Sequence, residues 1–342
     1  MNKKRKIDLV ARPDEHPFAQ YIRVIGKGKK GSRSFSYDEA VDAMTMVFNG
    51  QVTDFQLGAM LALLRVNEES PEELAGFVTA ARNHIQAPTS IAVDLDWSSY
   101  AGKRRQLPWY LLAALCLADS GLRVFMHGAK GHTAGRIYSE DVLAYLGIDA
   151  ATDWQQVGSQ LDSDNFAFMS LQTLCPPLQR IIELRNVMGL RTPVHTLSRL
   201  LNPLAADYSL QSIFHPAYGP SHQRAAQILR QKHALVIKGE AGEFERKPDA
   251  SCALLSVDDS QLSEQSWPRL TEERMPKLES LDVDRLAAVW HGEHDSYGEK
   301  AILGTIALVL HQLGKADDHQ QAYRLAETYW QQRNPNRIKQ DG

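Results

Sequence analysis

Residues 96–110 read DWSSYAGKRRQLPWY and connect a short apolar segment to a long apolar one. A buried strand followed at once by a buried helix is the unit from which parallel α/β sheets are built. At such a junction the first N–H groups of the helix attract anions, and glycines let the chain approach a phosphate closely. This loop has only Gly102, followed by the cations Lys103, Arg104 and Arg105. The stretch therefore predicts an α/β domain in which the usual phosphate cradle is missing.

Composition indicates a folded protein of two domains. The chain has 342 residues, of which 43% are hydrophobic and 23% charged, so disordered and collagen-like classes are excluded. The formal net charge is -3, yet residues 1–34 hold ten Lys or Arg against three Asp or Glu, an excess of +7 in a basic arm. The three cysteines are far apart, and we find neither a signal peptide nor an apolar run long enough for a bilayer. We therefore expect buried free thiols, no membrane contact and a cytoplasmic location.

Helical periodicity fills the first ninety residues after the arm. Thr53 and Ser70 are each followed three residues later by Gln56 or Glu73, the capping-box pattern that opens a helix. From residue 91 onward, short apolar runs alternate with helical ones. We expect strands at residues 91–95, 123–126 and 234–238, and helices at residues 107–119, 139–146, 221–231 and 283–333, with a helical stretch at 171–188 broken by two prolines.

The fold class predicted is α/β, with a small N-terminal helical domain and a larger domain that has a mostly parallel central sheet. The helical domain takes residues 1–90 and is completed by about 171–205. The α/β domain takes residues 91–170 and 206–342.

Four short motifs follow one another along the chain: FMHGAKG at residues 125–131, EDVLAYLG at 140–147, RNVMGLRT at 185–192 and LNP at 201–203. Together they resemble the Lys-His-Gly-Asn, Ala-Asp-Val-Leu-Glu-Ala-Leu-Gly, Arg-x-x-Leu-Gly-Ile-Arg-Thr and Leu-x-Asn-Pro segments of the anthranilate phosphoribosyltransferase family. The resemblance implies the nucleoside phosphorylase and phosphoribosyltransferase class of fold, and a homodimer formed through the helical domains. The subunit interface is then expected to bury some of the apolar residues on the first helices, among them Phe48, Phe55 and Met60.

The departures from this family fall on its chemistry. The family holds phosphoribosyl pyrophosphate in a Gly-Thr-Gly-Gly-Asp loop at the place of residues 96–110, where only Gly102 is left. His127 and Gly128 keep the centre of Lys-His-Gly-Asn, while the flanking lysine and asparagine have become Met126 and Ala129. The resemblance thus implies a degenerate substrate site, to which Arg185 would contribute from the hinge between the domains.

A second departure concerns magnesium. The family's acidic pair corresponds to Phe244 and Glu245, with Glu243 as a neighbour that could partly compensate. Magnesium is usually held by carboxylates together with substrate phosphates, so the loss of one carboxylate and of the phosphate loop removes both halves of the site. We expect no metal, and magnesium would be a cofactor only if the protein were a transferase.

Three basic segments are candidates for contact with a polyanion, and each has a plainer alternative. The arm could be a solubilising tail, the loop a solvated cationic loop, and His127 a structural histidine. A neighbouring aromatic residue, Trp97 or Tyr100, could offer a stacking face to a base. The candidate cations are Lys27, Lys29, Lys30 and Arg33 in the arm, Lys103, Arg104 and Arg105 in the loop, and Lys130, His132 and Arg136 after the second expected strand.

A scaffold with an erased phosphoribosyl site resembles the second, nucleic-acid-binding branch of the family. We therefore predict a protein that binds nucleic acid, DNA or RNA, without strict sequence preference and with single strands tolerated. The sequence shows no pairing of a nucleophile with a base. Whether the protein is an enzyme stays open, and we lean toward a protein without catalytic activity. The alternative is a glycosyl or phosphoribosyl transferase with a different phosphorylated substrate.

Overall fold

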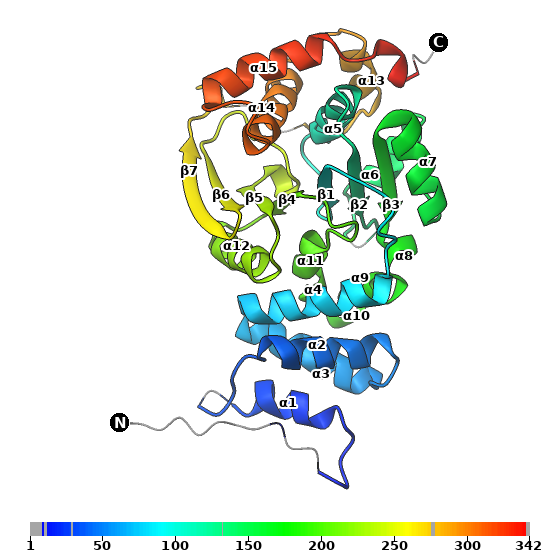
Figure 1. Cartoon of the computed structure of the whole chain (residues 1–342), viewed down its shortest axis with the longest axis vertical. Coiled ribbons are helices and arrows are strands. Elements are labelled where there is room, and N and C mark those ends of the chain that lie inside the picture. Colours follow the sequence, from blue (N-terminus) through cyan, green and yellow to red (C-terminus); the bar gives the residue numbers. More distant parts are fainter. Residues whose placement is uncertain (1–8, 10–11, 29, 132, 275–277, 340–342) are drawn as a thin grey trace.

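Seven strands form one sheet in the order β3-β2-β1-β4-β5-β6-β7, seen across the middle of Figure 1. The structure is a computed structural model, and it describes residues 9, 12–28, 30–131, 133–274 and 278–339. Neighbouring strands from β3 to β5 are parallel, and β6 and β7 add an antiparallel hairpin at one edge. The strands are β1 Leu95–Ser99, β2 Val124–Gly128, β3 Phe166–Ser170, β4 Tyr208–Ile213, β5 His233–Lys238, β6 Cys252–Asp258 and β7 Gln261–Trp267.

Helices cover the sheet, and a helical bundle extends from one end of it (Figure 1). The bundle comprises α1 Ala19–Gly26, α2 Tyr37–Phe48, α3 Asp54–Asn67 and α4 Pro71–Ile85, and α4 packs against α12 Gly219–Ile228 and α11 Val194–Leu197. The fold class predicted from the sequence is confirmed: an N-terminal helical bundle joined to an α/β domain with a mostly parallel sheet. The other helices are α5 Trp109–Asp119, α6 Ser139–Tyr145, α7 Trp154–Asp164, α8 Leu171–Leu174, α9 Pro176–Glu183, α10 Arg185–Met188, α13 Asp284–Trp290, α14 Ser296–Gln312 and α15 His319–Gln331.

Capping residues and prolines set the ends of several helices. Thr53 and Ser70 cap α3 and α4, and in both helices the capping box is complete, as predicted. The pair Pro176-Pro177 separates α8 from α9, because proline lacks the N–H that would continue the helix. All three cysteines are free and buried, and no helix within the described ranges has the length and apolarity to cross a membrane.

The two faces of the sheet belong to two different cores. Leu95 and Trp97 of β1 pack with α5 and α14, while Phe125 of β2 faces the core shared with the helical bundle. Successive side chains of a strand point to opposite faces, so one strand serves both cores. Helix α14 is buried along most of its length and contacts β5.

The first strand begins four residues later than its sequence pattern suggests. The apolar residues at 91–95 predict a strand there, but β1 spans Leu95–Ser99 and is fully buried in spite of three polar residues. The two serines find buried partners: Ser98 Oγ donates to the Leu210 carbonyl at 3.1 Å, and Ser99 Oγ lies 2.6 Å from Ser139 Oγ. A buried polar group costs little once it is hydrogen-bonded, and apolar patterning does not reveal such a strand.

The strand order creates a switch point between β1 and β4. From β1 the chain proceeds through β2 to β3 on one side, then returns to β4 on the other side of β1. In open α/β sheets, ligands bind beyond the carboxyl ends of the strands at such a point. The loops after β1 and β4 therefore lie where this fold offers a site.

Gly128 shows how closely the strands approach each other at this edge. A Cβ atom on Gly128 would lie 2.2 Å from the backbone oxygen of Ser99 on β1. We expect Gly128→Ala to lower the free energy of unfolding by about 1–3 kcal/mol, the usual cost of overpacking. Urea denaturation measures this, with Gly58→Ala on α3 as the control, since a Cβ there meets nothing within 4 Å. Equal stability of the two variants would contradict this account of Gly128.

Candidate functional site

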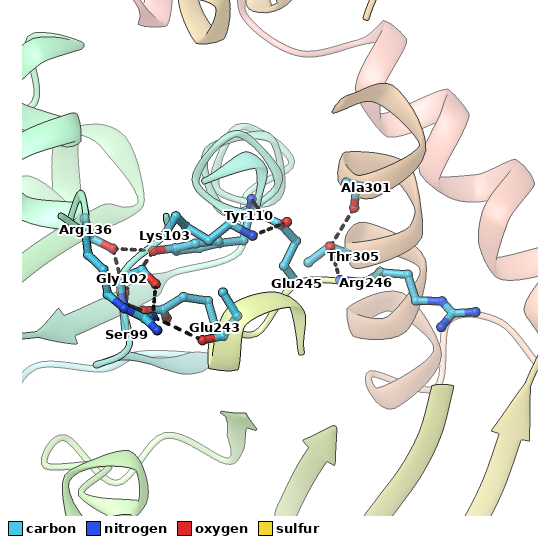
Figure 2. Close-up of polar contacts among 12 residues, drawn as sticks. Ser99, Gly102, Lys103, Tyr110, Arg136, Glu243, Glu245, Arg246, Ala301 and Thr305 are labelled. Atoms are coloured by element: carbon cyan, nitrogen blue, oxygen red, sulfur yellow. Dashed lines mark hydrogen bonds and ion pairs between the residues drawn. The ribbon is translucent and has the colours of Figure 1, made fainter. Parts of the chain in front are cut away.

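A carboxylate fills the loop after β1. Glu243 Oε1 accepts hydrogen bonds from the backbone N–H groups of Ala101 and Gly102, both at 2.6 Å (Figure 2). Gly102 has φ +68°, and a Cβ there would press against Tyr138 and Ile137. The single glycine of this loop is thus required by the backbone turn. The N–H pair that could receive an anion holds an internal carboxylate instead.

A second carboxylate occupies the start of the following helix. Glu245 Oε2 accepts from the backbone N–H of Tyr110 in the first turn of α5 at 2.9 Å, and its Oε1 lies 2.6 Å from Lys103 Nζ (Figure 2). The helix N-terminus favours negative charge, so this carboxylate satisfies both the dipole and the lysine. Glu245 and Lys103 are both fully buried. Burial raises the pKa of Glu245 to about 7 and also raises the pKa of Glu243, against the opposing pull of Lys103 and Arg199 respectively.

Arg136 holds the same loop from its other side. Its guanidinium donates to the backbone oxygens of Ala101 and Gly102 at 2.9 and 2.8 Å. These two residues are therefore bound by a carboxylate through their N–H groups and by a guanidinium through their oxygens. This arrangement fixes the loop in one shape, and Arg104 and Arg105 next to it remain exposed to solvent.

Beyond the loop, a cavity of about 610 Å³ opens at the switch point. Arg104, Arg105 and Arg136 line it from one side, and Lys238 and Lys247 line it from the end of β5 and the segment that follows. Its carboxylates are Glu240 and Asp249, of which Asp249 lies 3.4 Å from Lys247 Nζ. We call this cavity the cationic cleft.

A smaller cavity of about 220 Å³ adjoins the cationic cleft and shares Arg136, Phe214 and His215 with it. Arg191 lines it, and burial together with the nearby charges of Arg185, Arg136 and Arg199 lowers the pKa of Arg191 to about 10. Repulsion among cations that face one space makes that space attractive to an anion. We call it the side pocket.

Comparison with known proteins identifies the scaffold. Residues 110–332 match the a/b domain of the glycosyl transferase family, and residues 19–85 match the helical bundle domain of that family. The chain belongs to glycosyl transferase family 3. Uncharacterized protein YbiB of Escherichia coli K12 is 30% identical over 248 residues, which cover 70% of this chain and 76% of YbiB. The anthranilate phosphoribosyltransferase of Halobacterium salinarum R1 is 30% identical over 245 residues, 70% of each chain.

Solved structures in this family share the fold at lower identity. The anthranilate phosphoribosyltransferase of Thermus thermophilus superimposes with a TM-score of 0.74 at 22% identity, covering 87% of this chain and 92% of that one. The Saccharomyces cerevisiae enzyme in complex with PRPP and Mg has a TM-score of 0.75 at 15% identity, covering 94% and 95%. These likenesses concern the fold alone.

Several sequence-predicted site residues of this family 3 member are corrected by the structure. Lys103, expected on an exposed loop, is 0% exposed and paired with Glu245. Trp97 and Tyr100, expected to offer a stacking face, are 0% and 1% exposed and belong to the core. Phe214, directly after β4, is an exposed aromatic residue that lines the cleft. No motif in the sequence marks the residue after that strand, so Phe214 was not among the predicted site residues.

The other predicted cations lie in different surroundings. Arg33 forms a bidentate pair with Glu39, and Lys130 lies 2.9 Å from Glu140 and 3.4 Å from Asp141. Lys27 and Lys30 are exposed in the loop after α1, at the bundle end of the molecule (Figure 1). Lys29 and His132 lie outside the described residues. Of the ten cations predicted, Arg104, Arg105 and Arg136 line the cationic cleft.

His127 and Gly128 are core residues in this chain. The His127 side chain is fully buried, with Nδ1 2.6 Å from the Tyr100 hydroxyl and Nε2 3.2 Å from Asp96 Oδ1. The structural alternative for His127 therefore holds. Arg185 contacts Thr133, which links α10 to the segment after β2.

The acidic residues do not fit magnesium. Glu243 and Glu245 direct oxygens at backbone N–H groups and at Lys103, which are donors with no place in a metal's ligand shell. Within the described residues there is also no group of three or more His, Cys, Asp or Glu side chains suited to a metal. The His291 to Asp295 segment, which looks like a ligand cluster in the sequence, includes Asp295 as the N-cap of α14.

The buried pair of Lys103 and Glu245 gives a stability prediction. Glu245→Gln leaves the ammonium group buried without its carboxylate, so we expect a loss of about 3–5 kcal/mol in the free energy of unfolding. Lys103→Met should cost less at pH 5, because the isolated Glu245 binds a proton. Its folded pKa is raised above the unfolded value near 4.5, so the stability of Lys103→Met should fall as the pH rises toward 8.

Urea denaturation at pH 5 and pH 8 tests both variants. Glu272→Gln is the matched control, since Glu272 pairs with Arg269 at 2.6 Å on the surface and should change stability by no more than about 1 kcal/mol. A Glu245→Gln protein as stable as this control would contradict the role given to the pair.

Proposed function

We propose that the protein binds single-stranded nucleic acid in the cationic cleft. The observation that supports this most is the local charge. Together the cationic cleft and the side pocket are lined by nine Arg or Lys residues and three Asp or Glu residues, in a chain whose formal net charge is -3. Such a local excess serves to neutralise a polyanion, since phosphate contacts by Arg and Lys release condensed counterions.

The shape and chemistry of the lining favour a strand over a small phosphate ester. Arg104 and Arg105 are exposed on one wall, and Lys238 is exposed on another, so charges are spread along the cleft. Phe214, 47% exposed, offers a ring on which a base can stack. A backbone of regularly spaced phosphates with bases between them matches cations with an aromatic side chain among them.

The transferase alternative requires a phosphate site at the strand-to-helix loop and magnesium. Glu243 and Glu245 oppose both requirements, because they already accept hydrogen bonds from the N–H groups of the loop and of the helix start. The discriminating test is magnesium: turnover of a phosphorylated sugar that depends on added magnesium would favour the transferase, whereas contacts by Arg and Lys need no metal.

The double variant Arg104→Ala/Arg105→Ala tests the cleft directly. Affinity for a single-stranded oligonucleotide should fall for all sequences, and the slope of log affinity against log salt should become shallower by up to about 1.4, since each contact contributes about 0.7 for single strands. Fluorescence anisotropy at several salt concentrations measures both quantities. The control is Lys315→Ala/Arg324→Ala, which removes two exposed cations outside both cavities. If the two double variants bind alike with the same slope, the cleft is not the binding site.

We further propose that the protein is a homodimer through the helical bundle, as its family resemblance implies. Met60 is fully buried within the bundle, whereas Phe48 is half-buried and stacks on His84 with ring centroids 4.9 Å apart. On α3, however, Phe55 and Val66 are 91% and 79% exposed, and their spacing of three helical turns puts them on one face.

Sedimentation velocity at micromolar concentration tests this assembly. The wild-type protein should sediment as a dimer, and Phe55→Asp as a monomer, because a charge is costly in an apolar interface. Leu262→Asp, at an exposed apolar position on β7, is the control and should remain dimeric. A monomeric wild-type protein would overturn the proposal.

A further inference from the structure

The side pocket differs in character from the cleft that it adjoins. Beside charged residues, which are Arg65, Glu69, Arg136, Arg191 and Arg199, its walls carry uncharged hydrogen-bonding groups, among them Thr192, Thr196 and Ser212. Its volume of about 220 Å³ is below the range of about 300–1,000 Å³ typical of sites for drug-sized ligands. The pocket therefore suits one small ring system with polar edges.

The floor of the pocket has one charged residue, Arg199, among neutral polar ones. The Ser212 hydroxyl is buried and has no hydrogen-bond partner among the described residues. His222 is 2% exposed, its Nδ1 lies 3.2 Å from Gln211 Oε1, and burial lowers its pKa to about 3, so the imidazole carries no charge. Arg199 is charged but directs its guanidinium at the backbone oxygens of Ser212 and Gly242. A neutral polar edge can bind here, because the Ser212 hydroxyl is available to hydrogen-bond with it.

The mouth of the pocket is aromatic and cationic. Phe214 and His215 meet edge to face, with ring centroids 4.8 Å apart, and both border the cationic cleft as well. Arg191 and Arg136 lie beside them. Aromatic rings and guanidinium planes are the surfaces on which proteins stack bases that have left a nucleic-acid helix.

We propose that the side pocket takes one unstacked base of the strand whose phosphates bind in the cationic cleft. This inference rests on the proposed function and specifies its ligand. Each phosphate group of the strand has a base within one nucleotide of it, so a strand along the cleft brings a base to the shared border of the two cavities. A duplex keeps its bases paired and stacked, and an intact duplex therefore cannot fill the pocket.

A base bound in the side pocket should add to the affinity through the base itself and not through charge. The probes are an oligothymidylate and an abasic phosphodiester strand of the same length and charge. The wild-type protein should bind the base-bearing strand about tenfold more tightly or better, as expected when a stacked base is added. The duplex of the same length should gain no such advantage.

Thr196→Trp tests the pocket itself. Thr196 is half-buried on α11 and lines the pocket, so an indole there fills the space with no change in charge. The tenfold preference for the base-bearing strand should disappear, with the salt slope of that strand unaltered. Phe214→Ala, at a half-exposed position, should reduce the same preference and keeps the test open if the larger substitution disturbs folding.

Thr328→Trp supplies the matched control. It makes the same change at an exposed threonine on α15, outside both cavities, and should keep the full preference. Equal binding of the base-bearing and abasic strands by the wild-type protein would overturn the base pocket while leaving the cationic cleft in place. Failure of the wild-type protein to bind either strand would refute the proposed function, and the base pocket with it.

Discussion

Two buried carboxylates determine what this scaffold can bind. Backbone N–H groups in the loop after β1 and at the start of α5 point toward one region and need acceptors, since unsatisfied buried donors are costly. Glu243 and Glu245, both on the segment after β5, supply those acceptors from within the chain. At this strand-to-helix junction, the anions that accept from the N–H groups are carboxylates of the protein itself. Other features of the site follow from this substitution.

The first consequence concerns Lys103. A carboxylate buried at Glu245 requires a partner charge, and Lys103 provides it at 2.6 Å. Although Lys103 belongs to a run of three cations, it is thereby taken out of the surface. Arg104 and Arg105 remain exposed, and they face the cleft at the switch point with Lys238 from the end of β5. The positive charge available to ligands thus lies along the edge of the sheet, beside the N–H groups that Glu243 and Glu245 occupy.

Sequence patterns predicted those parts of the fold that depend on interactions between residues close together in the sequence. The capping boxes at Thr53 and Ser70 and the break at Pro176 follow from rules that span a few residues. Three of the strands and most of the longer helices were predicted from apolar runs, but α7 was not. The position of β1 was wrong because its buried serines are hydrogen-bonded to residues far along the chain, such as Leu210. Strands β3, β4, β6 and β7 were not predicted, since their patterns are short or polar.

The candidate site depends even more on contacts between residues that are distant in the sequence, and local patterns do not predict such contacts. The pairing of Lys103 with Glu245 joins residues 142 positions apart, and no local pattern marks it. The run of three cations predicted a uniform basic loop, whereas the structure divides it into one buried and two exposed members. Phe214 and Lys238 enter the site only because parallel strands bring their carboxyl ends to a common edge.

The central claim is that the internal carboxylates keep the loop closed to phosphate while a polyanion binds at the neighbouring cleft. A crystal structure of the protein with a short single-stranded oligonucleotide tests this most directly. The account predicts phosphates beside Arg104, Arg105 and Lys238, with the Glu243 carboxylate still hydrogen-bonded to the N–H groups of Ala101 and Gly102. A phosphate bound to those two N–H groups, with Glu243 displaced, would contradict it.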